Sequence, residues 1–155
     1  VAPAAIANTE TVVVSVTIGT SLLVVGSSFR IRAFGRLTSG ATAGSSIFRA
    51  RIGGTTLAGT IPATLTIANA ALVTNAPFSL DVLVTVRTAG AGGTVIGNAA
   101  VFGGVLGAFT VPADVSALSA TVAVDTTLAN LLELTYISGN AGTTATFENA
   151  TIGGA

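Results

Sequence analysis

Apolar and polar residues alternate along much of this chain with a period of two, which is the pattern of half-buried β-strands. The segment FSLDVLVTVRT (78–88) carries an apolar residue at every second position from Phe78 to Val86. The positions between them are more polar and include Asp81 and Arg87. This segment therefore predicts a long strand with one face toward a core and a mixed outer face.

Similar segments recur along the chain, rich in Val, Ile and Thr and separated by turns that contain glycine. They span 11–18, 28–37, 46–52, 63–68, 78–88, 93–102, 118–125, 130–137 and 143–152, and a further short strand is predicted at 105–111, before Pro112. Helix signals are nearly absent. The pattern predicts an all-β chain, a single-domain antiparallel β-sandwich of nine or ten strands, jelly-roll-like, over residues 1–155. We expect residues 1–10 to form an extended N-terminal arm.

The composition adds an unusual apolarity to this picture. Half of the residues are hydrophobic, 8% are charged, and the mean hydropathy is +0.84. Soluble domains are typically about 25% charged, so this chain either lies in a membrane or buries much of its surface against other protein. The uncharged stretch 11–29 is long enough to span a bilayer, but the polar Gly-Thr-Ser within it favours two strands around a turn. We therefore expect no membrane partner.

The residue types that are missing exclude several kinds of chemistry. The chain has no Cys, His or Lys, which excludes disulfides, His- or Cys-ligated metal sites, nucleophilic triads built on His, and Schiff bases on Lys. The six acidic residues are scattered and form no calcium-binding loop. With a net charge of zero, the chain has no broad basic field for nucleic acid. We expect no enzymatic activity, no cofactor and no metal.

The arginines are concentrated in two neighbouring predicted strands. Five of the six lie between residues 30 and 51: Arg30, Arg32, Arg36, Arg49 and Arg51. Alternation places the first three on one face of 28–37 and the last two on one face of 46–52. If these two strands pair through the 38–45 loop, the five side chains form one patch.

Three interpretations of this patch remain open. It could be a solvated sheet face, with the arginine stems covering apolar neighbours. It could be a subunit interface, because the planar guanidinium group pairs with carboxylates even when partly buried. The carboxylates of that interface would come from Asp81, Glu133 and Glu148 of the same or a neighbouring chain. It could also bind a glycan or phosphate, although Tyr136 is the only Tyr or Trp that could serve as a sugar platform.

Two long segments resemble a group of tailed-bacteriophage virion proteins. They are TNAPFSLDVLVTVRT (74–88) and VDTTLANLLELTYISGNAG (124–142), within a more diffuse similarity over about residues 9–152. Members of this group are small β-sandwich proteins, assigned as minor structural, capsid-decoration or fibre-like components. The resemblance implies a jelly-roll-like fold, assembly as a homo-oligomer, expected to be a trimer, and attachment to the particle surface. It transfers no functional residue.

We therefore expect a non-enzymatic virion protein that decorates the outer capsid surface and stabilises the shell by binding the major capsid protein. The alternative is a receptor- or glycan-binding module of a tail fibre or spike, using the loops 38–46 and 138–144. A subunit of a cellular adhesin or surface layer is a third possibility.

Overall fold

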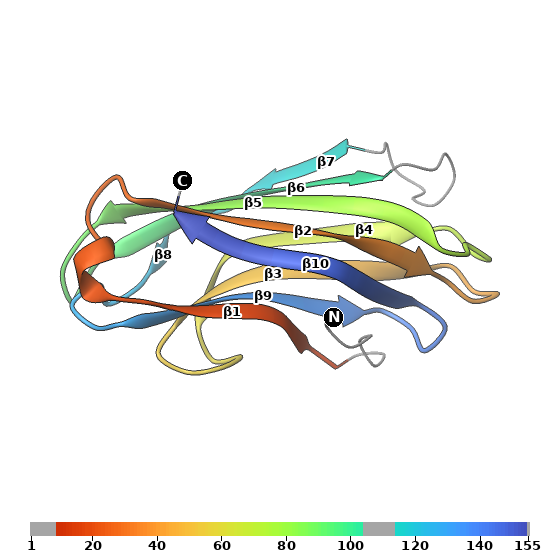
Figure 1. Ribbon diagram of the computed structural model, residues 1–155, viewed down its shortest axis with the longest axis horizontal. Coiled ribbons are helices and arrows are strands. Elements are labelled where there is room, and N and C mark those ends of the chain that lie inside the picture. Colours follow the sequence, from red (N-terminus) through yellow and green to blue (C-terminus); the bar gives the residue numbers. More distant parts are fainter. Residues whose placement is uncertain (1–8, 104–113, 155) are drawn as a thin grey trace.

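Two antiparallel sheets pack face to face as a β-sandwich in the computed structural model, which describes residues 9–103 and 114–154 (Figure 1). The four-stranded sheet has the order β1 (Thr11–Ile18), β9 (Asn130–Ser138), β3 (Gly44–Gly53), β4 (Thr60–Asn69). The six-stranded sheet has the order β10 (Thr144–Gly154), β2 (Ser28–Thr38), β5 (Ala76–Thr88), β6 (Thr94–Gly103), β7 (Asp114–Leu118), and β8 (Val122–Ala123) also pairs with β6. The predicted all-β antiparallel sandwich is confirmed.

The chain crosses from one sheet to the other after β1, β2, β4, β8 and β9, and this connectivity places β2 and β3 in opposite sheets. The pairing through the 38–45 loop, on which a single arginine patch would depend, is therefore not formed. That loop crosses the sandwich instead, alongside the loop that joins β4 to β5. The backbone N–H of Ser39 donates to the carbonyl of Val73 at 2.9 Å, and that of Leu72 donates to Gly40 at 2.8 Å.

Four aromatic rings form the centre of the core. Phe48 and Tyr136 come from the four-stranded sheet, Phe78 and Phe147 from the six-stranded sheet, and neighbouring centroids lie 5.3 to 6.4 Å apart. The Tyr136 hydroxyl lies 3.0 Å from the Ser46 hydroxyl, so its polar end is satisfied inside the sandwich. Tyr136 is fully buried, which makes it unavailable as the sugar platform considered from the sequence.

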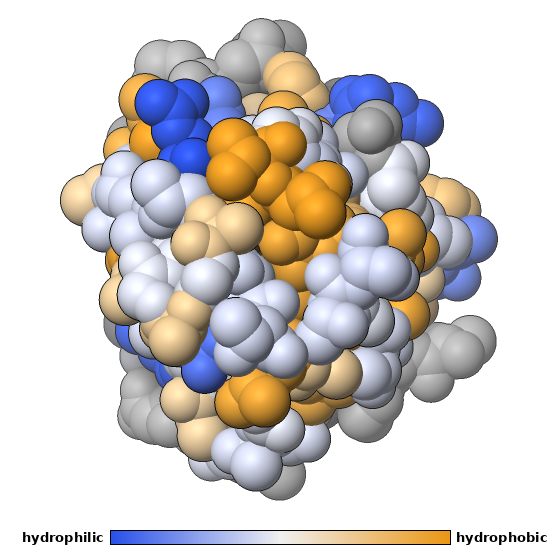
Figure 2. Space-filling view, turned by 90° about the vertical axis from the view of Figure 1, so that its left-hand side faces the viewer, coloured by the Kyte–Doolittle hydropathy of each residue, from blue (hydrophilic) through white to orange (hydrophobic). Residues whose placement is uncertain are grey.

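The uncharged stretch 11–29 forms β1, a short 3-10 turn η1 (Thr20–Leu22) and the start of β2, as the sequence predicted. The turn and the residues after it expose Leu22, Val24 and Val25. Apolar surface runs across this end of the sandwich (Figure 2). No helix within the described parts of the chain is long and apolar enough to cross a membrane.

Most predicted strands appear within a few residues of their expected bounds. The exception is the strand predicted at 118–125, because β7 ends at Leu118 and β8 covers only Val122–Ala123. The backbone N–H of Ser119 donates to Gly97 and that of Val124 donates to Gly93, so the chain follows β6 with a break between the two short strands. The strand predicted at 105–111 and residues 1–8 of the predicted arm lie outside the described residues.

Candidate functional site

The five clustered arginines divide between the two outer faces of the sandwich. Because β2 and β3 belong to different sheets, their outward side chains point away from each other across the core. Arg49 and Arg51 lie on the outer face of the four-stranded sheet. The three arginines of β2 lie on the outer face of the six-stranded sheet. The single patch expected from the sequence is therefore wrong, and two separate sites replace it.

On the four-stranded sheet, Arg49 and Arg51 converge on Glu10. Arg51 donates from Nε and Nη2 to the two carboxylate oxygens of Glu10, each at 2.7 Å, and Arg49 donates from Nη1 at 3.1 Å. The Thr135 hydroxyl donates to the same carboxylate. Glu133 and Thr135 point outward from the same sheet but are almost inaccessible to solvent. We call the following five residues the buried cluster: Glu10, Arg49, Arg51, Glu133 and Thr135.

Glu10 was not among the predicted site residues. It directly precedes β1, and β1 pairs with β9 so that Val12 stands opposite Thr135, which in turn stands opposite Arg49. Glu10 lies two residues before Val12, so its side chain is on the same face of the sheet. Its proximity to Arg49 and Arg51 depends on the pairing of β1 with β9, which is more than a hundred residues away, and the sequence alone does not show that pairing. The hydrogen bonds from Arg51 are the main cause that lowers the pKa of Glu10 from 4.5 to about 2, against the opposing effect of burial.

Glu133 holds a loop rather than forming an ion pair with an arginine. It stands opposite Arg51 in register, and its Oε2 accepts the backbone N–H of Leu57 at 2.9 Å. Arg51 donates from Nη1 to the carbonyl of Gly59 at 3.0 Å, which fixes the same loop at a second point. A Cβ at Gly59 would lie 2.7 Å from the Ile52 carbonyl oxygen, so the close return of this loop requires glycine. The buried cluster thus ties residues 54–59 and Glu10 onto the sheet.

On the six-stranded sheet, the arginines remain in solvent. Arg30 donates from Nε to both oxygens of Asp81, at 2.9 and 3.0 Å. Arg32 stands opposite Asp81 but approaches its carboxylate only to 3.6 Å, and Arg36 approaches Glu148 to 3.5 Å. The side chains of Arg32 and Arg36 are 62% and 59% exposed, against 13% for Arg51.

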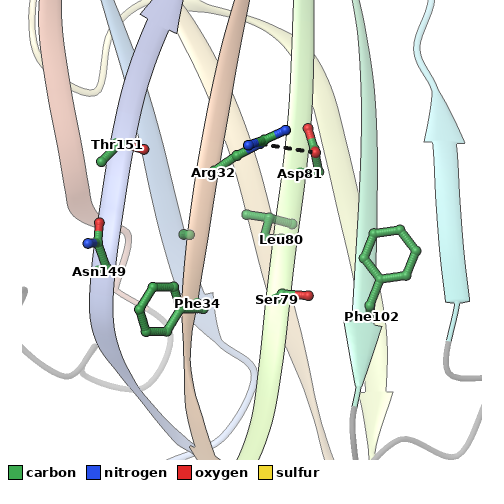
Figure 3. A pocket seen from close by; sticks show the side chains of 9 residues that line it. Arg32, Phe34, Ser79, Leu80, Asp81, Phe102, Asn149 and Thr151 are labelled. Carbon is green, nitrogen blue, oxygen red and sulfur yellow. Dashed lines mark ion pairs between the residues drawn. The ribbon is translucent and has the colours of Figure 1, made fainter.

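Two phenylalanines accompany these arginines on the same face. In the strand register Phe34 and Phe102 both stand opposite Ser79, one on each side of β5. They are 52% and 46% exposed and line a shallow groove of about 410 Å³ that extends past Phe34 to Asn149 and Thr151 on β10 (Figure 3). We call the outward residues of this sheet the open face: Arg30, Arg32, Phe34, Arg36, Ser79, Asp81, Leu83, Phe102, Leu118, Glu148, Asn149 and Thr151.

The two loops proposed for receptor binding close on each other. The Asn140 side chain donates to the carbonyls of Thr42 at 3.1 Å and Ala43 at 3.3 Å. A Cβ at Gly40 would lie 3.2 Å from the Cα of Gly142, so the two backbones nearly touch. These loops therefore direct their polar groups toward each other, and the open face offers more exposed chemistry than they do.

Comparisons with family models, curated proteins and solved structures find no match to this chain. Among the described residues, no group of three or more acidic side chains gathers in a way that could hold a metal ion. The resemblance to phage virion proteins stays a prediction. The outer face of the four-stranded sheet is covered around Arg49 and Arg51 by its own chain, while the arginines of the six-stranded sheet are exposed.

Proposed function

We propose that this chain is a non-enzymatic structural protein of a phage virion, a capsid-decoration protein whose open face makes protein contacts in the assembled particle. The observation that carries this proposal is the pair of half-exposed rings, Phe34 and Phe102, beside the exposed Arg32. Aromatic residues and arginine are enriched at the centres of protein interfaces. Burial of one Phe side chain stabilises a contact by about 1.5–3 kcal/mol.

The decoration role follows from how such a contact acts on a shell. A protein that binds the assembled capsid and not its free subunits shifts the equilibrium toward the assembled state. Symmetric oligomers, expected here to be trimers, engage several capsid subunits at once and multiply a modest affinity per site. The partners are the major capsid protein and further copies of this chain, and the location is the outer capsid surface.

The test uses expanded, undecorated capsids of the phage that encodes this sequence. The wild-type protein should bind them saturably and raise their melting temperature. A Phe34→Ser/Phe102→Ser double variant should bind at least tenfold more weakly, because it removes both rings either from the capsid contact or from the contact between copies that makes binding multivalent. Leu72→Ser is the matched control, since Leu72 is 75% exposed in a loop outside the open face. Absence of saturable wild-type binding, or undiminished binding of the double variant, would contradict the proposal.

A specific observation supports a second candidate, a glycan-binding module of a tail fibre. The groove beside the two rings also presents polar groups: Ser79 and Asp81 lie on β5, between the strands that carry the rings, and Asn149 lies on β10, on the other side of Phe34 (Figure 3). Rings beside carboxylate and amide groups offer both an apolar stacking surface and hydrogen-bonding partners for a sugar. A glycan array without hits would count against this candidate and leave the decoration role as the explanation of the open face.

A further inference from the structure

The charges of the described side chains on the open face do not balance. Four arginines face outward on this sheet, the three of β2 and Arg87 of β5, against two carboxylates among the side chains that the structure describes there, those of Asp81 and Glu148. Asp81 is bound on both oxygens by Arg30, so Arg32 retains only one contact, at 3.6 Å. The surplus positive charge is therefore centred on Arg32, next to Phe34 and the groove.

This surplus of positive charge determines which kind of partner surface can bind the open face. Two copies packed open face to open face would bring two positive surpluses together, which is unfavourable. A complementary surface instead carries a carboxylate for Arg32 and an apolar side chain for the groove. Phe34 and Phe102 lie on strands two apart, which separates their backbones by about 10 Å. Ser79 lies between them as a small floor, so one aliphatic side chain fits between the rings.

The chain itself carries a segment of this chemistry. Of the acidic side chains that the structure describes, Asp125 is the one that neither lies buried nor takes part in an ion pair. Leu128, in the same turn between β8 and β9, is 61% exposed. Leu118 is also exposed, but it belongs to the open face itself. Outside that face, the other prominent exposed apolar side chains, at Leu72 and around Val25, lie in loops without any acidic residue.

The turn of Asp125 and Leu128 is also well held. One oxygen of the Asp125 carboxylate accepts from the backbone N–H of Thr127 at 2.9 Å and from its hydroxyl at 2.6 Å. Asn130 donates to the carbonyls of Asp125 and Leu128, at 2.8 and 2.9 Å. These bonds fix the turn in one conformation and leave the second carboxylate oxygen available, so little order would be lost on contact with a partner.

We infer that a second copy of this chain occupies the open face and that it does so through this turn. Asp125 of one copy lies against Arg32 of the next, and its Leu128 enters the groove between Phe34 and Phe102. Because the two surfaces differ, the contact is head-to-tail and generates a closed ring when the rotation between copies is suitable. The inference rests on the proposed function, of which it specifies the self-association.

Charge reversal tests the pairing directly. Light scattering of the wild-type protein should give a multiple of 15.0 kDa, three times that value for a trimer. Arg32→Asp alone and Asp125→Arg alone should each reduce the mass to 15.0 kDa, and the double variant should restore the wild-type mass. Arg87→Asp is the control, because Arg87 is an exposed arginine of β5 outside the groove and its reversal should not change the mass.

Cysteine pairing tests which surfaces meet, and the absence of native Cys makes the result unambiguous. Ser79→Cys and Leu128→Cys proteins, with tags of different size, are mixed and oxidised. Our inference predicts mixed disulfide dimers that contain one of each. Dimers of the Ser79→Cys protein alone would indicate face-to-face packing and would overturn it.

The outcomes separate the inference from the proposed function. A wild-type protein that stays at 15.0 kDa at high concentration overturns the self-association, while capsid binding still tests the decoration role. If charge reversal leaves the mass unchanged but the Phe34→Ser/Phe102→Ser variant lowers it, the open face is an interface with a different occupant. If none of these variants alters mass or capsid binding, the open face is not a docking surface.

Discussion

On the four-stranded sheet, Arg49 and Arg51 are 27% and 13% exposed and share a carboxylate from the start of the chain. On the six-stranded sheet, Arg30 and Arg32 also share one carboxylate, that of Asp81, but they are 45% and 62% exposed. Residue type and spacing are the same in the two pairs. What differs is the covering, since the four-stranded sheet receives Glu10 and the 54–59 loop over its outer face.

This comparison separates arginines that hold the fold together from arginines that are accessible to a partner. In the buried cluster two arginines meet two carboxylates, and hydrogen bonds tie three distant parts of the chain together. That arrangement leaves little charge for a ligand. On the open face the ion pairs are longer or more exposed, the described side chains carry an excess of positive charge, and two phenylalanine rings stand beside Arg32. We therefore place the proposed docking surface on the sheet whose arginines the chain leaves uncovered.

The largest expected effect comes from replacing one arginine on each face. Arg51→Ala should lower the free energy of unfolding by about 3 kcal/mol, because it leaves Glu10 and Glu133 without their nearest opposite charge. Arg32→Ala should change it by less than about 0.5 kcal/mol, as is usual for an exposed ion pair. Urea unfolding of both variants at neutral pH measures the difference.

The control for Arg51→Ala is Arg51→Lys, which keeps the charge but loses the paired hydrogen bonds, and it should fall between the two. Equal destabilisation by Arg51→Ala and Arg32→Ala would show that the two faces are energetically alike and would break the comparison on which the assignment of the open face depends.

Local patterns explain how much of the fold the sequence could predict. The inward faces of β2, β3 and β5 follow from period-two alternation, which each strand carries by itself. The partner of each strand is a non-local property. Nothing in the 38–46 loop, which is made of small and polar residues, indicates that it crosses to the other sheet instead of closing a hairpin.

The contacts of the candidate site also divide into those that the sequence led us to expect and those that depend on non-local packing. Asp81 and Glu148 lie close to arginines, as the sequence led us to expect, and within the same chain. Glu148 reaches Arg36 from a bulge in β10, and Glu10 reaches Arg51 from outside any strand. A bulge and a strand-to-strand register depend on tertiary packing, so neither contact could be derived from spacing alone.

The second largest effect is expected from acid, which should lower the free energy of unfolding by protonating Glu10 in the buried cluster. The pKa of Glu10 is lowered to about 2 in the folded protein, so its contribution to stability is complete above pH 4.5 and is lost as the pH falls from 4.5 toward 2. We expect a loss of about 2 kcal/mol over this range, less than the full shift implies because the pair is partly exposed to solvent. Urea midpoints of the wild-type protein and Glu10→Gln between pH 7 and pH 2 measure it.

The Glu10→Gln protein should be less stable than wild type at pH 7 and nearly equal to it at pH 2. In an Arg51→Ala background the same substitution should have a much smaller effect, because the hydrogen bonds that lower the pKa are already lost. Parallel acid profiles for wild type and Glu10→Gln would mean that Glu10 does not pair with Arg51 in solution.

The smallest effect is expected for the exposed ion pair between Arg36 and Glu148 on the open face. Arg36 and Glu148 are 59% and 46% exposed and lie 3.5 Å apart, so Glu148→Gln should lower the melting temperature at low salt by less than about 2 °C. At about 1 M salt, where charges are screened beyond about 3 Å, the difference should vanish. Glu10→Gln is the matched comparison, because a partly buried pair is screened less and its effect should persist in salt. A large, salt-resistant effect of Glu148→Gln would mean that this part of the open face is covered in solution, as it would be if another copy of the chain already lies on it.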